Sequence, residues 1–463
     1  MSLMVSISGV RGIVGESLTP EVIVRYTSAF AGYCRERSKG RPLVILGRDG
    51  RVGGKIIGNL VSSTLLAGGV DVCALGICPT PTVQLAVEKK KASGGISITA
   101  SHNPIQWNGL KFLGPSGMFL DAEENAALWK LADKGDPSYA GWDSTGNHVA
   151  DDTWLQRHLD AVLADPLVDP ELIRPAGLKI VVDCVNGAGG VIVPNLLRAL
   201  GCTVIEMNCD LSGRFAHTPE PIPENLGDLC ARVLRERAHL GIAIDPDGDR
   251  LVFITEKGEP FGEEYTITAA VKYVLSKTEK RSPEKKAVVA TNLSTTRAID
   301  DVAAQFGATV IRTPVGEINV ARAMQKSGAL IGGEGSGGVI YPPVHLGRDA
   351  MAGIPLVLQL LIANGGTMSD LKRSLPHYVI TKSKIEIGSL NPASVLAGIR
   401  SSVAKDARVN DQDGLRIDMP DSWVHLRKSN TEPIIRIIAE ATTEDEASRL
   451  VDEYRRKITG SAR

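Results

Sequence analysis

The sequence predicts an α/β protein with three related βαβ domains and a closing α+β domain. Two observations support this prediction: one strand–helix–strand plan occurs three times, and the character of the chain changes near its end. The three copies begin at Leu43, Lys179 and Ala287. Because parallel strands need a crossover connection, which is right-handed almost without exception, each copy predicts a βαβ unit. We therefore expect three related domains with mixed sheets around a central cleft.

Each copy passes through the same elements in the same order. It opens with a short apolar strand: Leu43–Leu46, Ile180–Asp183 or Val288–Ala290. A corner rich in Gly, Asp and Asn follows and leads into a helix: Gly47–Gly50, Asn186–Gly187 or Thr291–Asn292. A glycine then ends the helix, because glycine adopts the left-handed cap without strain: Gly68, Gly201 or Gly307. A second apolar strand completes each unit.

The chain changes character from about Leu371. Three strand-like segments and a helical segment follow: Tyr378–Ile387, Trp423–Leu426, Ile434–Ile438 and the helical Thr443–Lys457. This pattern indicates an α+β domain. A chain of 463 residues also exceeds what one hydrophobic core supports. We place the four domains at residues 1–150, 151–257, 258–370 and 371–463.

The composition favours small molecules as partners. The net charge is −1 with both signs interspersed, which gives no basic surface for nucleic acid or a membrane. The longest apolar runs, such as Ile354–Leu361, are much shorter than the roughly 20 residues of a membrane-spanning helix. The seven cysteines are odd in number and form no C-x-x-C pair, which indicates buried thiols in a reducing compartment. We expect a cytoplasmic monomer or homodimer.

A serine stands just beyond a predicted strand, in the run T-A-S-H-N-P. Gly95–Thr99 alternates as a strand, and Pro104 forbids its continuation. The loop between them holds Ser101, His102 and Asn103. Loops at the carboxyl ends of parallel strands are where α/β proteins form their sites, and a serine hydroxyl can carry a phosphoryl group. For this segment alone, a plain turn rich in Ser and Asn is the alternative.

Three carboxylates alternate along a second loop, D-P-D-G-D-R, between the apolar runs Leu240–Ile244 and Leu251–Thr255. Asp245, Asp247 and Asp249 can be aimed at one small cation, and ligand sets made of oxygen alone favour Mg²⁺. The mutual repulsion of three carboxylates also calls for a cation. Phosphoryl transfer needs such an ion, because its transition state spreads charge over oxygens. The two loops together therefore predict a phosphoryl-transfer centre.

Three other readings of the acidic loop fit less well. An EF-hand needs Gly at the sixth loop position, where the chain has Arg250, and the flanking segments are strand-like rather than helical. The nucleophile loop of haloacid-dehalogenase type, D-x-D-x-[TV], needs Thr or Val where the chain has Asp249. A solvated Asp-Gly turn does not account for three aligned carboxylates.

These segments together resemble the α-D-phosphohexomutase family, which includes bacterial phosphoglucomutase/phosphomannomutase and phosphoglucosamine mutase. The run T-A-S-H-N-P-I-Q-W-N-G-L-K resembles the phosphoserine loop of that family. The resemblance implies that Ser101 is phosphorylated, that Lys111 donates or accepts a proton and that His102 helps to hold the phosphoryl group. Ser8–Gly12 is similar to the family's G-x-R-G loop, which implies that Arg11 contacts the phosphoserine.

The acidic loop resembles the family's D-G-D-x-D-R metal loop. This resemblance implies that Asp245, Asp247 and Asp249 bind Mg²⁺. An oxygen of phosphorylated Ser101 would complete the ligand set. Arg250 would then face the phosphoryl group that moves.

The segment Gly332–Gly338 is a glycine-rich loop with one carboxylate and one hydroxyl, which alone could be a flexible linker. It resembles the family's G-E-x-S-G-H loop, which implies that Glu334 and Ser336 bind sugar hydroxyls. Gly338 stands where the family has histidine, so another group must take over its part in proton transfer, or the reaction does without it. His345 is one candidate, with a structural role as its alternative.

Hydrogen-bond donors crowd the segment R-K-S-N-T-E-P near the end of the chain, and a further arginine follows. Such donors suit the oxygens of a phosphate, although the segment alone is equally typical of a Ser/Asn turn. It resembles the family's R-x-S-[GN]-T-E-P loop, which holds the phosphate that is not transferred. The resemblance carries this role to Arg427, Ser429, Asn430, Thr431 and Arg436.

Two further segments are similar to the family. Arg312–Glu317 resembles its R-T-x-V-G loop, slightly nearer the phosphoglucosamine type. Gly47–Arg51 resembles its G-R-D-x-R segment, which we assign to the framework of the first domain rather than to chemistry.

The resemblance implies a reversible transfer of a phosphoryl group between the 1- and 6-positions of a hexose phosphate. The phosphoryl group would pass through phospho-Ser101 and a hexose 1,6-bisphosphate. Glucosamine phosphate and glucose or mannose phosphate remain open as substrates. A non-catalytic phosphosugar-binding protein and a metal-dependent sugar phosphatase are the alternatives, and the intact Ser101, Lys111 and acidic loop speak against the first.

Overall fold

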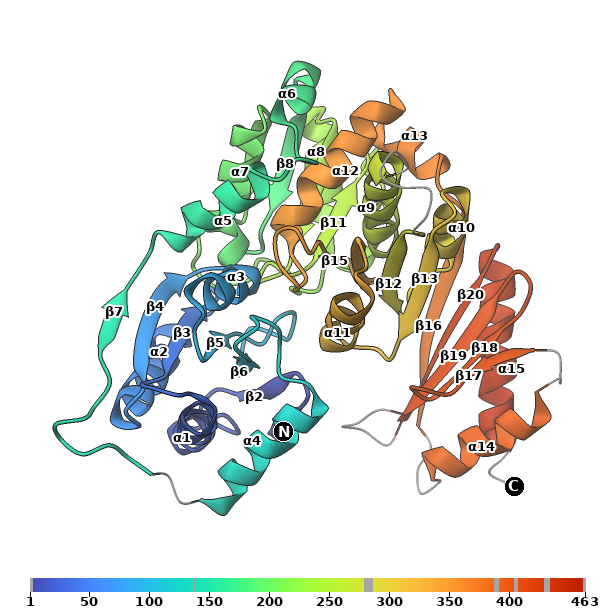
Figure 1. Ribbon diagram of the computed structural model, residues 1–463. Coiled ribbons are helices and arrows are strands. Elements are labelled where there is room, and N and C mark those ends of the chain that lie inside the picture. Colours follow the sequence, from blue (N-terminus) through green and yellow to red (C-terminus); the bar gives the residue numbers. More distant parts are fainter. Residues whose placement is uncertain are drawn as a thin grey trace.

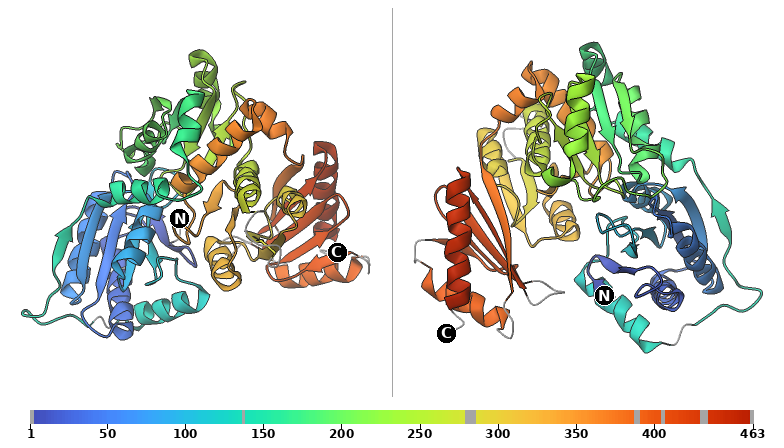
Figure 2. Two further views of the ribbon diagram at one scale, coloured as in Figure 1. Left: turned by 45° about the horizontal axis from the view of Figure 1, so that its top comes forward. Right: turned by 180° about the vertical axis from the view of Figure 1, so that it is seen from behind.

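The computed structural model describes residues 3–135, 138–278, 286–386, 391–403, 407–428 and 434–460. Its four sheets follow one another along an arc, from the first domain at the lower left of Figure 1 to the last at the lower right. Figure 2 shows the same arc from behind, with the first and last domains at its two ends. The expected α/β architecture with mixed sheets and a closing α+β domain is confirmed.

Three of the sheets repeat one strand order, in which three parallel strands are followed by an antiparallel one. In the first domain these strands are β4 (Asp71–Ile77), β3 (Leu43–Arg48), β5 (Gly94–Ile98) and β6 (Trp107–Leu113). In the second they are β9 (Thr203–Met207), β8 (Lys179–Asp183), β10 (Leu240–Ile244) and β11 (Leu251–Ile254). In the third they are β13 (Thr309–Thr313), β12 (Val288–Asn292), β14 (Ile331–Glu334) and β15 (Gly338–Ile340). Each domain therefore has one turn in the same topological place, between its last two strands.

The first domain extends this sheet on both sides. The added strands are β1 (Met4–Ser6) and β2 (Gly9–Ile13) beyond β6, and β7 (His148–Ala150) beyond β4. Three helices share one apolar core with the sheet: α1 (Pro20–Arg37), α2 (Gly54–Ala67) and α4 (Ala122–Lys134). α3 (Thr80–Lys90) belongs to a separate core that also holds the start of α5 (Trp154–Leu163). This second core joins the first domain to the next.

The second and third domains share one continuous apolar core. Their remaining helices are α6 (Pro170–Ile173), α7 (Val193–Ala199), α8 (Gly227–Glu236), α9 (Glu263–Thr278), α10 (Ala298–Gln305), α11 (Glu317–Ser327), α12 (Ala350–Asn364) and α13 (Met368–Arg373). α12 is almost entirely buried and packs against α9. At its start, the carboxylate of Asp349 caps the helix and accepts hydrogen bonds from His158 and His345. This cluster fixes the first turn of α12 against α5.

The last domain is an antiparallel sheet with two helices that share its apolar core. Its strands follow the order β16 (Val379–Glu386), β20 (Ile434–Ala441), β19 (Trp423–Lys428), β18 (Leu415–Asp418) and β17 (Arg408–Asn410). The helices are α14 (Pro392–Ser402) and α15 (Glu444–Gly460). All seven cysteines of the chain are free, and five of them are buried. Within the described ranges, no helix combines the length and the apolar character needed to cross a membrane.

Candidate active site

All four domains contribute residues to one central cleft of about 1040 Å³. The first three domains present to it the turns between their last two strands. The β5–β6 turn carries Ser101, the β10–β11 turn carries the three aspartates, and the β14–β15 turn carries Glu334 and Ser336. The sequence did not predict this equivalence. Because each domain repeats one topology, the same turn is available three times, and the arc brings the three copies together.

Ser101 lies at the base of the cleft in a strained but well-held loop. Its φ of +49° is in the left-handed region, which costs a residue other than glycine about 1–2 kcal/mol. Its backbone N–H donates to Thr99 Oγ1 at 2.8 Å, and its carbonyl accepts from Arg51 Nη2 at 2.6 Å. The hydroxyl donates to Asp245 Oδ2 at 3.1 Å, and His102 Nδ1 lies 3.3 Å from the same oxygen. The fold thus holds the serine hydroxyl against the acidic loop.

The three aspartates of the acidic loop are completely buried. Asp245 Oδ1 accepts the backbone N–H groups of Asp249 and Arg250, at 3.1 Å each, which fixes the turn. Asp247 Oδ2 accepts from Lys111 Nζ at 2.6 Å and from Thr80 Oγ1 at 2.7 Å.

Two oxygens of this loop are left over. Asp249 Oδ2 accepts from Arg348 Nη2 at 2.7 Å, while Oδ1 of Asp249 and Oδ1 of Asp247 have no partner among the described residues. One oxygen of each aspartate lies within 4.8 Å of the others. Buried carboxylate oxygens without a donor are costly unless a cation binds them. The residues present therefore fit a metal ion with oxygen ligands.

The protonation of these groups follows from burial and from the neighbouring charges. Burial and the charges of Asp249 and Asp247 raise the pKa of Asp245 well above its ordinary value. Burial alone would raise the pKa of Asp247, but Lys111 holds it below its ordinary value. Burial likewise opposes the charge of Lys111, and Asp247 and Asp249 outweigh it and raise its pKa. A cation bound at this loop would favour the charged form of all three carboxyl groups.

Two arginines and a histidine line the cleft beside Ser101. Arg11 Nη1 donates to Asn103 Oδ1 at 2.9 Å, and Arg250 Nη1 donates to Glu220 Oε1 at 3.3 Å. The Nε atoms of both arginines are buried without a partner among the described residues. Burial, with the charges of Arg250 and Arg11, lowers the pKa of His102 well below its ordinary value, so its imidazole is neutral. Such donors suit the oxygens of a phosphoryl group.

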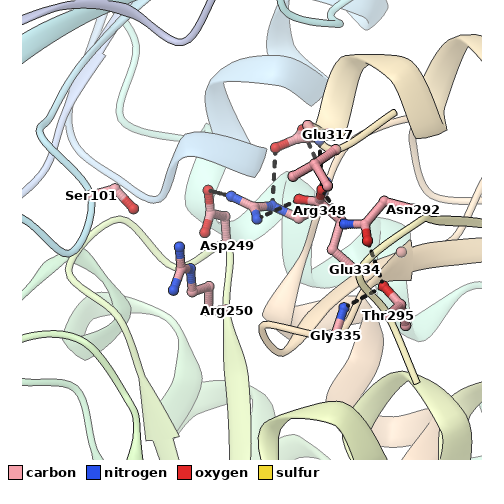
Figure 3. Close-up of polar contacts among 12 residues, drawn as sticks. Ser101, Asp249, Arg250, Asn292, Thr295, Glu317, Glu334, Gly335 and Arg348 are labelled. Carbon is pink, nitrogen blue, oxygen red and sulfur yellow. Dashed lines mark hydrogen bonds and ion pairs between the residues drawn. The ribbon is translucent and has the colours of Figure 1, made fainter. Parts of the chain in front are cut away.

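Three hydrogen-bond donors from different segments of the chain hold the glutamate of the glycine-rich turn. Glu334 Oε1 accepts from Asn292 Nδ2 at 2.7 Å and from the backbone N–H of Gly316 at 2.9 Å. Its Oε2 accepts from Arg348 Nη1 at 2.9 Å. Figure 3 shows Arg348 between this glutamate, Glu317 and the acidic loop. Ser336 also lines the cleft.

The last domain brings two of its predicted residues to the cleft. Arg427 and Arg436 are paired neighbours on β19 and β20, and both line the cleft. Ser429, Asn430 and Thr431 lie outside the described residues. These two arginines on neighbouring strands give the cleft a second group of cationic side chains, which suit the oxygens of a phosphate.

The site differs from the sequence prediction in three respects. Arg348 and Glu317 meet the predicted residues only through long-range contacts. Arg51 belongs to the segment assigned to the framework, and it also holds the serine loop through the carbonyls of Ser101 and Asn103. His345, the candidate substitute for the missing histidine, does not line the cleft and pairs instead with Asp349.

Comparisons with known proteins agree with this geometry along the whole chain. Four models match in order, namely phosphoglucomutase/phosphomannomutase alpha/beta/alpha domains I, II and III and the C-terminal domain, at residues 4–138, 156–258, 262–378 and 391–457. A "Probable phosphoglucosamine mutase" of Methanopyrus kandleri is 38% identical over 450 residues, 96% of each chain. A phosphoglucomutase/phosphomannomutase of Thermococcus kodakarensis is 38% identical over 440 residues, 95% of this chain and 94% of that one.

A solved structure gives the same result for the fold. The phosphoglucomutase/phosphomannomutase family protein of Burkholderia thailandensis superposes with a TM-score of 0.85 at 26% identity, and the match covers 99% of this chain and 98% of that one. The chain therefore belongs to the phosphoglucomutase/phosphomannomutase family and is a phosphohexomutase.

Proposed function

We propose that the protein interconverts the 1- and 6-phosphates of a hexose through phospho-Ser101 and a hexose 1,6-bisphosphate. The observation that supports this most strongly is the 3.1 Å contact between Ser101 Oγ and Asp245 Oδ2 at the base of the cleft. These groups are 144 residues apart in the sequence. A structural serine has no need of three buried carboxylates beside it.

Mg²⁺ is the metal that the donors favour, since all of them are carboxylate oxygens. Asp245, Asp247 and Asp249 would hold it, together with an oxygen of phosphorylated Ser101. When bound, the ion neutralises charge on the phosphoryl oxygens during transfer.

The side chains around Ser101 divide the remaining work. Arg11 and Arg250 would donate to the oxygens of the moving phosphoryl group. Lys111 carries its proton at Nζ and would supply it to Ser101 Oγ when the P–O bond to that oxygen breaks. A hydroxyl of the sugar forms the new bond to phosphorus, and its proton would pass to the Nζ of Lys111, which has become neutral by giving its own proton to Ser101 Oγ. In the reverse step Lys111 takes the proton of Ser101 back.

The other end of the substrate needs a site that can accept either phosphate. We assign this to Arg427, Ser429, Asn430, Thr431 and Arg436, because their donors suit the oxygens of a phosphate that stays in place. Glu334 and Ser336 would bind the sugar hydroxyls between the two ends. The bisphosphate would turn around in the cleft so that each phosphate in turn faces Ser101.

The substrate class is a hexose phosphate with either an amino group or a hydroxyl at carbon 2. One relative at 38% identity is named for glucosamine phosphate and another at the same identity for glucose and mannose phosphates. We would assay glucosamine, glucose and mannose 1-phosphates in parallel with the wild type and with Ser101→Ala. The control is Ser63→Ala, which changes an exposed serine on α2. We expect conversion by the wild type and by Ser63→Ala but not by Ser101→Ala. Undiminished turnover in Ser101→Ala would refute the mechanism, and net release of phosphate would indicate a phosphatase.

A further inference from the structure

Arg348 lines the cleft and contacts three carboxylates, but the proposed mechanism does not use it. It lies directly before Asp349, the residue that caps α12. The backbone of this segment is fixed against β15, since Asp349 N–H donates to the carbonyl of Val339 at 2.8 Å and Arg348 forms an antiparallel bridge with Ile340. The carboxylate of Asp349 is held in turn by His158 at 2.8 Å. The start of the Arg348 side chain is therefore rigidly placed.

The guanidinium of Arg348 distributes its donors over three buried carboxylates from three elements. Nη2 donates to Asp249 at 2.7 Å, Nη1 to Glu334 at 2.9 Å and Nε to Glu317 at 3.1 Å. The first belongs to the acidic loop, the second to the glycine-rich turn and the third to the start of α11. Figure 3 shows these contacts as one connected group. A planar guanidinium fixes the directions of all three bonds at once, which a lysine cannot do.

The glycine at position 338 leaves the space that the side chain of Arg348 needs for these contacts. A Cβ added to Gly338 would lie 2.2 Å from Cδ of Arg348 and 3.0 Å from its Cγ. The backbone φ of Gly338 is not in the left-handed region, so only space, and not backbone strain, opposes a side chain there. The arginine therefore occupies the room of a side chain at position 338. This is the position where the resemblance to the family leads one to expect histidine.

The contacts of Arg348 also decide which oxygens remain free. Each carboxylate oxygen accepts about two hydrogen bonds. Oε1 of Glu334 already has two donors, so Oε2, with Arg348 as its one donor, keeps a place for a sugar hydroxyl. Arg348 and Lys111 both bind Oδ2 of Asp249, which leaves Oδ1 without a partner among the described residues. One side chain thus orients a sugar ligand and a metal ligand together.

We propose that Arg348 is a positioning residue of the mutase reaction. It takes the space of a side chain at position 338 and fixes the positions of Glu334 and Asp249 relative to each other. This inference rests on the proposed function. The guanidinium of Arg348 connects the two loops, because it binds Glu334, which would bind the sugar hydroxyls, and Asp249, which would bind the cation.

The test is a pair of double-mutant cycles with a matched control. The first cycle compares Gly338→Ala, Arg348→Ala and the double variant by kcat/KM for the preferred 1-phosphate. We expect a loss of roughly tenfold or more for Gly338→Ala and roughly 100-fold for Arg348→Ala. The double variant should be no worse than Arg348→Ala, because the added Cβ has no arginine left to displace. Arg348→Gln, which keeps a donor, is the second variant if the alanine variant does not fold.

The second cycle reads binding without turnover, in a Ser101→Ala background. Calorimetry with glucose 1,6-bisphosphate should show that Arg348→Ala and Glu334→Gln each weaken binding by roughly tenfold and that their effects do not multiply. The control is Arg416→Ala, which removes another buried arginine, paired with Asp418 at 2.7 Å in the last domain. It should lower the Tm and leave binding and kcat/KM unchanged.

Independent, multiplying effects in either cycle would overturn the proposal, as would a kcat/KM for Arg348→Ala within twofold of the wild type. The failure of the proposed function is recognised separately. In that case the wild type converts none of the three 1-phosphates, while the binding cycle still reports whether Arg348 acts through Glu334.

Discussion

The replacement of Arg51 by lysine should both destabilise the protein and release the serine loop. The Arg51 side chain is only 1% exposed. It donates to Asp49 at 3.1 Å and to four backbone carbonyls of the serine loop and its flank, at 2.6–2.9 Å: Ser101, Asn103, Pro104 and Trp107. These bonds hold Ser101 in its left-handed conformation, with φ of +49°.

The size of the effect follows from the number of donors. Arg51 makes five side-chain hydrogen bonds, and a lysine ammonium has three donors, so Arg51→Lys loses at least two. Hydrogen bonds to a charged group contribute about 1.5–3 kcal/mol each, which predicts a loss of about 3 kcal/mol or more in the free energy of unfolding. Arg51→Met also leaves the buried carboxylate of Asp49 unpaired, and breaking a buried ion pair costs about 3–5 kcal/mol.

Urea denaturation measures the free energy of unfolding. Intact-mass analysis measures the phosphoserine occupancy, and steady-state assays measure kcat, both at a temperature where the wild type and the variant are folded. The strain of Ser101 costs about 1–2 kcal/mol, so a loop freed from Arg51 relaxes, and both phosphoserine occupancy and kcat should fall. Arg25→Lys is the control, because this exposed arginine pairs with Asp133 at the surface and its loss should cost less than about 1 kcal/mol. If Arg51→Lys matched the control in stability and kcat, this account of the serine loop would be wrong.

Three further predictions concern charge and metal. Burial raises the pKa of Glu264 from 4.5 to about 8, so the stability that this group contributes is complete below pH 4.5 and is lost as the pH rises through 8. Denaturation at pH 5 and at pH 9 should therefore show that the free energy of unfolding falls by roughly 1–3 kcal/mol more in the wild type than in Glu264→Gln. Chelation by EDTA should lower the Tm, and Mg²⁺ at 100 times its Kd should restore about 2.7 kcal/mol in the wild type but much less in Asp247→Asn. Arg436→Ala should raise KM by roughly tenfold or more with a smaller change in kcat, because it removes a donor to the stationary phosphate; an unchanged KM in steady-state assays would remove that residue from the phosphate site.

Local chemistry explains which parts of the molecule could be predicted from the sequence. Ser101 and the three aspartates lie in short segments whose residue types alone indicate their chemistry. The βαβ units could be predicted from apolar strands that alternate with helices ended by glycine. The segment around Arg348 does not indicate its role, because that role depends on contacts with residues far away in the sequence, such as Asp249, 99 residues before it.

Gly338 is a related case. In the sequence it is a missing histidine, and only the folded structure shows that the side chain of Arg348 fills the space next to it. The equivalence of the three functional turns was equally hidden, because a strand order is a property of the folded sheet and not of any segment.

The central claim is that Ser101 carries the phosphoryl group beside a cation held by Asp245, Asp247 and Asp249. The most direct test is to incubate the protein with glucose 1,6-bisphosphate labelled in its phosphates, digest it and locate the label. We expect one phosphoryl group, on the peptide that contains Ser101, which passes to added hexose 6-phosphate when Mg²⁺ is present and stays on the protein when the metal is chelated. Label on a different residue, or full turnover with Ser101 never phosphorylated, would contradict the claim.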